Sequence, residues 1–263
     1  MAQSEPGADG ASARKRRAGI VPSLQVEQAL WRSGKLRVAG VDEVGLGSIC
    51  GPVVACAVLL PAGCRMIERV RDSKALTAGE RERLFAVIVA EAAAVGLGAA
   101  SVKEVDALNV LRASHLAMRR ALARLGPYDH ALVDGRPIKD ADLGPHTAIV
   151  DGDATSYAIA CASIVAKVTR DRLMHRLARF YPGYAWETNV GYGTPEHLEA
   201  LRKLGLTPLH RRTYAPVQAV LLASAADNGE AKPAAAAGPS ALLPGDASAP
   251  FTAVADLTPA AEE

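Results

Sequence analysis

VAGVDEVGLGSICGPVV, residues 38–54, places two carboxylates directly after a run of apolar residues. The apolar run predicts a buried strand at 37–41, and Asp42 and Glu43 follow it at once. A carboxylate at the end of a buried strand is costly to desolvate unless a cation or hydrogen-bond donors neutralise it. Glycines further along the stretch allow another backbone to come close, because they lack a side chain. The stretch therefore predicts an acidic site at the end of a strand.

Strand and helix patterns alternate outward from this stretch. Capping boxes at Thr77/Glu80 and Ser101/Glu104 mark two helix starts. A second buried strand is expected at 52–60, and the remaining elements follow from hydrophobic periodicity. The expected strands are 97–101, 131–133 and 148–150, and the expected helices are 77–92, 101–125, 157–180 and 194–205. This pattern is typical of an α/β domain with helical material at its C-terminal end.

Composition bounds the organisation of the chain. Its 263 residues are 49% hydrophobic and 22% charged, which fits one substantial soluble domain with extensions. The net charge is only +2, so any basic surface for nucleic acid must be local. Residues 1–18, with a basic cluster at 14–17, and residues 226–263, rich in Ala and Pro, are predicted to be disordered tails. Residues 19–225 are then the folded domain.

Several classes of protein are excluded by what the chain lacks. No run of 18 apolar residues predicts a membrane span, and the N-terminus has no apolar core of a secretory signal. We therefore expect a cytoplasmic protein. The four cysteines show no CxxC spacing, so neither a zinc site nor a disulfide framework is expected, and Cys56 and Cys161 are predicted to be core residues.

Two further acids have settings like that of Asp42. Asp134 follows the apolar residues 131–133, and Asp153 follows the apolar pair at 149–150. Such acids could converge at the carboxyl edge of a sheet, where α/β folds place their ligands. Carboxylate oxygens suit Mg²⁺ or Mn²⁺ rather than zinc. Each acid taken alone is equally well explained as a turn residue beside a glycine.

The motifs of the chain, taken together, resemble those of bacterial type II ribonuclease H. Residues 38–54 are similar to the N-terminal signature of that family, and the resemblance covers roughly residues 35–218 because seven further motifs occur in the expected order. These are DSKALT (72–77), KEVDALNVLRASHLAM (103–118), LVDG (132–135), GDATSYAIACASIVAKVTRDRLM (152–174), YPGY (181–184), GYGT (191–194) and HRRTYAPV (210–217). The resemblance implies a ribonuclease H-like mixed five-stranded sheet flanked by helices, with a helical C-terminal extension.

The resemblance also implies an activity. Asp42, Glu43, Asp134 and Asp153 match the four catalytic acids of the family, and the first three are expected to bind the metal, Mn²⁺ or Mg²⁺. The implied reaction is two-metal hydrolysis of the RNA strand of RNA–DNA hybrids, and of DNA containing ribonucleotides, giving 5′-phosphate and 3′-hydroxyl ends. We expect a monomer. Because the metals supply the nucleophile, His115, His175 and His197 are interpreted as ordinary helix residues. Asp171 is interpreted as part of an intrahelical ion pair.

Substrate contacts are implied in the same way. The backbone of Gly45–Gly47 is expected to approach the 2′-hydroxyl that distinguishes RNA from DNA, and Tyr192 to stack at the ribose. Cationic side chains are candidates for phosphate contacts; they are Lys74, Lys167, Arg170, Arg211 and Arg212. Each could equally be a solvated surface residue. The chain departs from the family at Leu46, where arginine is usual, and at Thr155 and Val190, where lysine is often found.

Two alternatives remain open from the sequence. A type III ribonuclease H would typically carry an extra N-terminal binding domain, and only about 35 residues precede the first motif here. A non-catalytic hybrid-binding protein would be expected to lack one or more of the metal-site acids, and all four are present.

Overall fold

A mixed five-stranded sheet forms the centre of the computed structural model, which describes residues 21–137 and 141–228. The strands follow the order β3-β2-β1-β4-β5. Strand β2 is antiparallel to both β1 and β3, whereas β4 is parallel to both β1 and β5. The strand bounds are β1 Val38–Val44, β2 Val53–Leu59, β3 Ala94–Ala100, β4 His130–Asp134 and β5 His146–Ile149. The expected mixed five-stranded fold is confirmed.

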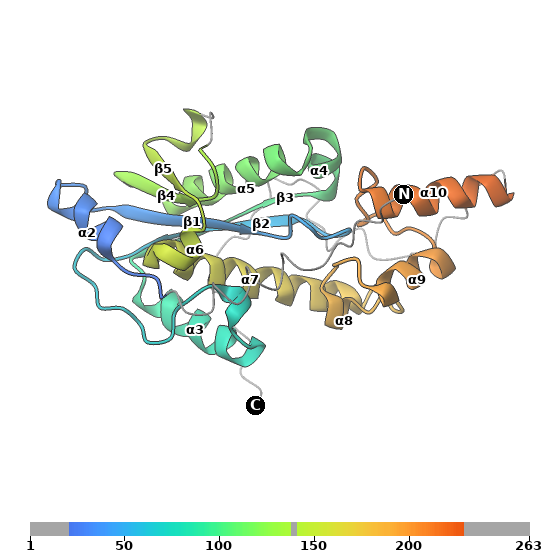
Figure 1. The fold of residues 1–263 in the computed structure, drawn as a ribbon, viewed down its shortest axis with the longest axis horizontal. Helices are drawn as coiled ribbons and strands as arrows, with labels where there is room; N and C mark the ends of the chain where they lie inside the picture. Colours follow the sequence, from blue (N-terminus) through green and yellow to red (C-terminus); the bar gives the residue numbers. More distant parts are fainter. Residues whose placement is uncertain (1–20, 138–140, 229–263) are drawn as a thin grey trace, which may run out of the picture.

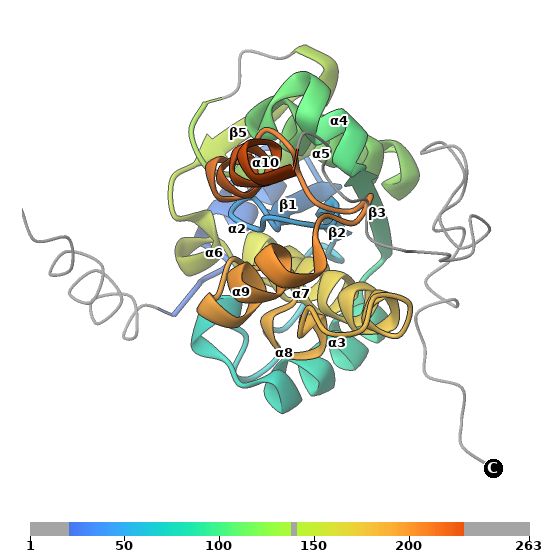
Figure 2. The same cartoon turned by 90° about the vertical axis from the view of Figure 1, so that its right-hand side faces the viewer.

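Helices cover both faces of this sheet, as Figures 1 and 2 show. One face carries α4 (Val102–Leu108) and α5 (Val110–Leu125), and the other carries α7 (Tyr157–Ala178) with α3 (Ala78–Glu91) packed on it. The helical C-terminal extension consists of α8 (Trp186–Asn189), α9 (Pro195–Leu204) and α10 (Ala215–Asn228). It packs on the loop after β1 through a separate core that includes Cys50 and Trp186. The remaining short elements are α2 (Gln25–Arg32), α6 (Gly152–Thr155) and the 3₁₀ turns η1 (Ser73–Ala75) and η2 (Ala141–Leu143).

Glycines in the strands let the helix backbones lie directly on the sheet. A Cβ added to Gly98 would lie 2.1 Å from the carbonyl oxygen of Ala117 in α5, and one on Gly40 would lie 2.1 Å from the backbone of Ala158 in α7. Only glycine permits so close an approach. Strand β1, which carries Asp42 and Glu43, therefore lies directly against α7, and β3 lies directly against α5.

Most predicted elements are present, including both capping boxes, but the helix predicted over 101–125 is wrong. The chain breaks at Asn109, which has a φ of 71° and whose side chain accepts hydrogen bonds from Leu111 and Arg112 as the N-cap of α5. Leu108 and Leu111, on either side of this break, are 36% and 61% exposed.

Helix α2 was not predicted from the sequence. Its Glu27 is fully buried and accepts hydrogen bonds from the Ser156 hydroxyl and the Ala158 amide, so it ties the helix to the start of α7. A contact between residues so far apart in the chain leaves no local pattern.

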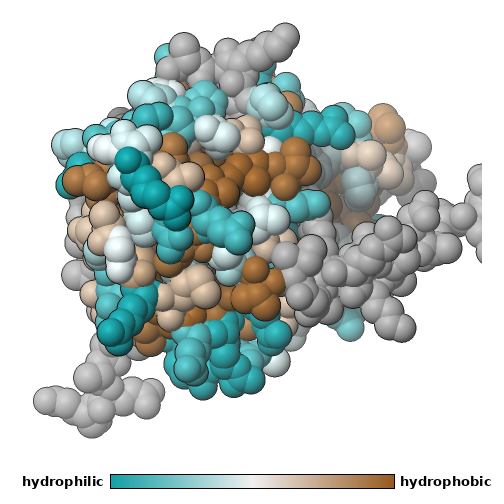
Figure 3. Space-filling model, turned by 60° about the vertical axis from the view of Figure 1, so that its left-hand side comes forward, coloured by the Kyte–Doolittle hydropathy of each residue, from teal (hydrophilic) through white to brown (hydrophobic). Residues whose placement is uncertain are grey.

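The surface view in Figure 3 shows apolar side chains in patches interrupted by hydrophilic ones. No helix within the two described ranges is long and apolar enough to cross a membrane. The predicted tail at 1–18 lies outside the described residues, as does most of the one at 226–263; helix α10 continues to Asn228, past the predicted boundary.

Candidate active site

The four acids gather at one edge of the sheet. Asp42 and Glu43 lie within β1 rather than after it, because the strand continues to Val44 and pairs them with Cys56 and Ala55 of β2. Asp134 is the last residue of β4, which is parallel to β1. The register pairs Val133, just before Asp134, with Val41, just before Asp42. The two aspartates therefore lie at the same level on adjacent parallel strands.

Hydrogen bonds fix these carboxylates. Asp134 Oδ1 accepts from the Gly152 amide at 2.7 Å, which ties β4 to the helix that carries Asp153. Asp42 Oδ1 accepts from the Glu43 amide at 2.7 Å. The ammonium of Lys74 lies 3.3 Å from Asp153 Oδ2. Lys74 reaches that position on the turn η1, where its amide is bonded to Asp72.

The carboxylates repel one another in a buried setting. Burial raises the pKa of Asp42 well above its usual value, and the charges of Glu43 and Asp134 raise it further. Burial, followed by the charge of Asp134, raises the pKa of Glu43 to about 7. Burial also raises the pKa of Asp153, against the opposing effect of Lys74. The buried acids therefore lack enough nearby positive charge to hold all of them ionised at their usual pKa values.

One carboxylate oxygen of the cluster is buried without a partner. In the described part of the chain, Glu43 Oε2 meets no hydrogen-bond donor. A buried anion of this kind costs free energy unless a cation or a donor reaches it. A donor set made only of carboxylate oxygens suits a hard divalent cation such as Mg²⁺ or Mn²⁺, and the residues present fit that group.

The expected substrate residues lie beside one another. Gly45 has a φ of +94°, and a Cβ there would lie 2.4 Å from Arg170 Nε, so no other residue fits. Gly47 is exposed, and a Cβ on it would lie 3.9 Å from the ring of Tyr192. A backbone bridge joins Ser48 to Tyr192. The tertiary structure thus brings Gly45–Gly47, which we call the glycine loop, next to Tyr192, although 145 positions separate Gly47 from Tyr192.

The cationic candidates divide into two groups. Lys167 lies 5.6 Å from the Tyr192 ring centroid and forms the expected ion pair with Asp171, at 2.8 Å, within α7. Lys74 and Arg212 are exposed. Arg170 and Arg211 are fully buried, and their guanidinium groups donate to backbone carbonyls. The expectation that these two arginines contact phosphates is wrong, because their side chains do not reach the surface.

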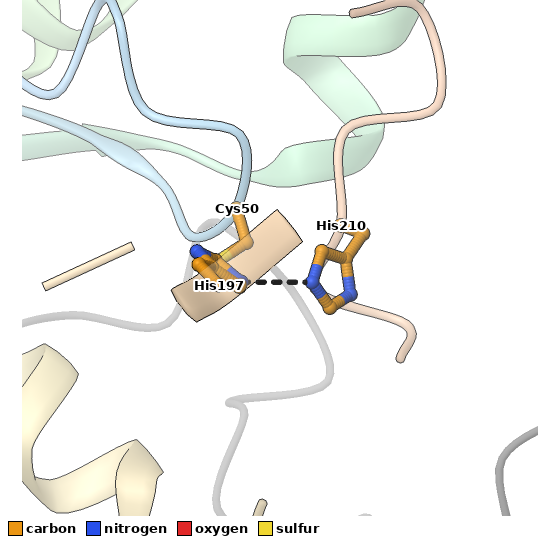
Figure 4. Close-up of side chains that lie close together, drawn as sticks. All are labelled: Cys50, His197 and His210. Atoms are coloured by element: carbon orange, nitrogen blue, oxygen red, sulfur yellow. Dashed lines mark hydrogen bonds between the residues drawn. The ribbon is translucent and has the colours of Figure 1, made fainter. Parts of the chain in front are cut away.

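His197 has more partners than the expected ordinary helix residue. It lies buried beside His210 and Cys50 (Figure 4), a grouping that the sequence could not reveal because Cys50 lies about 150 positions before the two histidines. Its Nε2 accepts from the indole of Trp186 at 2.9 Å, so its hydrogen is on Nδ1, which meets the Tyr192 carbonyl at 2.9 Å.

His210 completes this network. Its Nδ1 accepts from the Thr207 amide at 2.9 Å, so its Nε2 carries the hydrogen and donates to His197 Nε2 at 3.2 Å. The nitrogens that a metal ion would need are therefore already engaged, and the guanidinium groups of Arg170 and Arg211 lie close enough to act on Cys50 electrostatically. These hydrogen bonds fix the backbone of Tyr192 through His197, and they leave no free ring nitrogen for a zinc ion.

The fold and the acid cluster together define a nuclease of the ribonuclease H-like class. The family model described as Ribonuclease HII matches residues 39–217. A ribonuclease HII of Thermosynechococcus vestitus is 59% identical over 192 residues, covering 73% of this chain and 90% of the relative. A ribonuclease HII of Ruegeria pomeroyi is 51% identical over 213 residues, covering 81% of this chain and 90% of the relative.

A solved structure agrees with these sequence matches. The crystal structure of the ribonuclease H2 from Pyrococcus horikoshii OT3 superimposes with a TM-score of 0.58 at 30% identity, covering 70% of this chain and 96% of that one. The chain belongs to the ribonuclease HII family. It is an endoribonuclease that cleaves the RNA strand of RNA–DNA hybrids. Family membership decides against the two alternatives left open by the sequence.

Proposed function

We propose that the enzyme also cuts at single ribonucleotides embedded in DNA, and that Asp42, Glu43, Asp134 and Asp153 are its catalytic acids. The observation that carries the assignment is the buried carboxylate cluster with the unpartnered Glu43 Oε2. Asp42, Glu43 and Asp134 would hold Mn²⁺ or Mg²⁺. Asp153, paired with Lys74, lies at the margin of the cluster, where it can share in binding a second ion or orient water.

The reaction is hydrolysis of a phosphodiester. Two divalent ions, when bound, supply an activated water and stabilise the charge that develops on the departing 3′ oxygen. The chain contributes the fixed geometry of the acids: the parallel pairing of β1 and β4 sets Asp42 beside Asp134, and the Gly152 amide orients the Asp134 carboxylate. The products would carry a 5′-phosphate and a 3′-hydroxyl.

Recognition of the ribonucleotide is assigned to the glycine loop and Tyr192. Among the described residues, no backbone acceptor in a turn or loop meets the amide of Gly47, and Gly47 is exposed, so this donor is available to a ribose. The 2′-hydroxyl is the group that separates RNA from DNA at a given site. Lys74 and Lys167 lie beside Asp153 and Tyr192, respectively, where they can meet phosphates on either side.

A cleavage assay on a duplex with one embedded ribonucleotide tests the proposal. Cutting 5′ to the ribonucleotide is expected with Mg²⁺ or Mn²⁺, and none is expected with EDTA or on the all-DNA duplex of the same sequence. Asp134→Asn should lose the activity while keeping its fold, as measured by circular dichroism. Normal cleavage by Asp134→Asn, or cleavage that survives EDTA, would refute the assignment of the site.

A further inference from the structure

A buried arginine of the C-terminal extension, Arg211, donates hydrogen bonds to backbone carbonyls in and next to the glycine loop. Arg211 follows α9 and is fully buried. Its Nη1 donates to the carbonyl of Leu46 at 3.1 Å, and its Nε donates to the carbonyl of Gly51 at 3.0 Å. Tyr214, three residues on, donates its hydroxyl to the same Leu46 carbonyl at 2.6 Å and accepts from Arg211 at 2.9 Å. Two linked donors therefore meet one carbonyl.

The direction of that carbonyl fixes the direction of an amide. The peptide between Leu46 and Gly47 is trans, because the described chain contains no cis peptide. In a trans peptide the C=O and the following N–H lie in one plane and point in opposite directions. Since the Leu46 carbonyl points inward to Arg211 and Tyr214, the Gly47 amide points outward, and Gly47 is exposed.

The rest of the loop is held separately. The guanidinium of Arg170 donates to the carbonyls of Cys50, Pro52 and Val190 and fills the space beside Gly45. Arg170 therefore fixes the base of the loop and its junction with the Tyr192 segment. Those bonds do not reach the Leu46–Gly47 peptide, which is the central peptide of a turn closed by a hydrogen bond from the Ser48 amide to the Gly45 carbonyl at 3.3 Å. Within that turn, the Leu46 carbonyl is held by Arg211 and Tyr214.

We propose that Arg211 and Tyr214 are positioning residues for ribonucleotide specificity: they lock the Leu46–Gly47 peptide so that the Gly47 amide faces the 2′-hydroxyl. The inference rests on the proposed function, because it assumes that the loop reads the ribose. It assigns to the HRRTYAPV segment a role at a distance, without contact with substrate.

The test compares two substrates on the active enzyme with Mg²⁺. The kcat/KM for the single-ribonucleotide duplex measures ribose recognition, and the inhibition constant of the all-DNA duplex of the same sequence measures general binding. Arg211→Lys keeps the charge but loses the forked contact, and Tyr214→Phe removes only the hydroxyl. The neighbouring Arg212→Ala is the matched control, since that arginine is exposed and only its amide is bonded, to Asp106.

We expect Arg211→Lys to lower kcat/KM by about tenfold and Tyr214→Phe by several-fold, as for loss of single hydrogen bonds, with the DNA inhibition constant unchanged within about twofold. Arg212→Ala should instead weaken both substrates together and reduce their salt dependence. If Arg211→Lys does not fold, Tyr214→Phe decides alone. Unchanged discrimination in Tyr214→Phe, or equal weakening of both substrates, overturns the inference.

Failure of the proposed function gives a different result. In that case the wild-type enzyme itself would not distinguish the ribonucleotide duplex from the all-DNA duplex. Wild-type discrimination that persists in folded Arg211→Lys and Tyr214→Phe, at a lower melting temperature, would assign these residues to stability alone.

Discussion

Asp42 illustrates how a single residue of the proposed site is expected to cost stability. Its burial and its acidic neighbours both disfavour the charged form, as its raised pKa reflects. We expect Asp42→Asn to melt at the same or a higher temperature than the wild type in EDTA, because the substitution removes one of several repelling charges.

The same substitution should remove metal-dependent behaviour. Mg²⁺ or Mn²⁺ is expected to raise the melting temperature of the wild type by binding the folded state, with little effect on Asp42→Asn, and cleavage by the variant should fall to background. A variant that melts far below the wild type in EDTA would show that Asp42 stabilises the fold, contrary to this account.

Leu46 is the clearest departure from the family pattern at the residue scale. Its apolar side chain is half-buried against the core on the α4/α5 side. Being uncharged, it cannot supply the cation that an arginine would offer to the substrate. We expect Leu46→Arg to tighten binding, because charge-assisted hydrogen bonds to phosphate contribute roughly 1.5–3 kcal/mol.

The measurement is a salt series of KM and single-turnover rates on the single-ribonucleotide duplex. KM should fall and become more salt-sensitive, with a smaller change in the chemical step; Leu46→Gln controls for the loss of the apolar contact. Weaker or unchanged binding by a folded Leu46→Arg would mean that the loop does not reach the phosphate.

His210 predicts an acid-sensitive contribution to stability. Burial, and secondarily the neighbouring His197, lowers its pKa from 6.5 to about 3. Below pH 6.5 the unfolded chain binds a proton that the folded chain does not, so the free energy of unfolding falls as the pH drops from 6.5 toward 3. The loss is at most about 1.4 kcal/mol per pH unit.

Urea unfolding of the wild type and of His210→Gln at pH 4 to 7 isolates this contribution. The buried acids act with the opposite sign in the same range, but they are common to both proteins. We expect the variant to be less stable at pH 7 yet to lose less stability on acidification. Equal slopes for the two proteins would mean that His210 is not held neutral.

At the scale of elements, the sheet and α5 are in contact through backbone. Because a Cβ on Gly98 would lie 2.1 Å from the Ala117 carbonyl oxygen, Gly98→Ala must push the helix from the strand. We expect a loss of about 1–3 kcal/mol or more from this overpacking. The control is Gly79→Ala in the first turn of α3, where a Cβ meets nothing within 4 Å and a small gain is expected. Chemical denaturation measures both; equal effects at the two sites would contradict the close packing.

At the scale of the whole molecule, residues 1–17 and 229–263 are predicted to be dispensable. Residues 1–17 and 229–263 have little of the apolar content needed to join a core. Deleting both segments is expected to leave cleavage of the ribonucleotide duplex within a few-fold at physiological salt. The basic cluster at 14–17 should matter only at low salt, where phosphate contacts are amplified. A large loss at physiological salt would place one of these segments in the binding surface.

The sequence by itself determined the elements whose cause is local. Apolar runs, capping boxes and the Thr194-Pro195 helix start depend on neighbours a few residues away, so α3, α7 and α9 were predicted close to their observed bounds and the strands to within three residues of theirs. The break at Asn109 was missed, because a helix pattern continues through it and only the positive φ reveals the cap. The motif order was enough to indicate the family and to name the four acids.

Only the tertiary structure decided how these residues act together. The parallel pairing of β1 with β4 sets Asp42 beside Asp134, and η1 carries Lys74 to Asp153. Arg170 and Arg211, which look like surface cations in the sequence, are buried beneath the glycine loop. A side chain's charge is fixed by its type, whereas its burial and its partners are set by contacts between residues far apart in the sequence, such as Lys74 and Asp153, and those contacts leave no periodic trace in the chain.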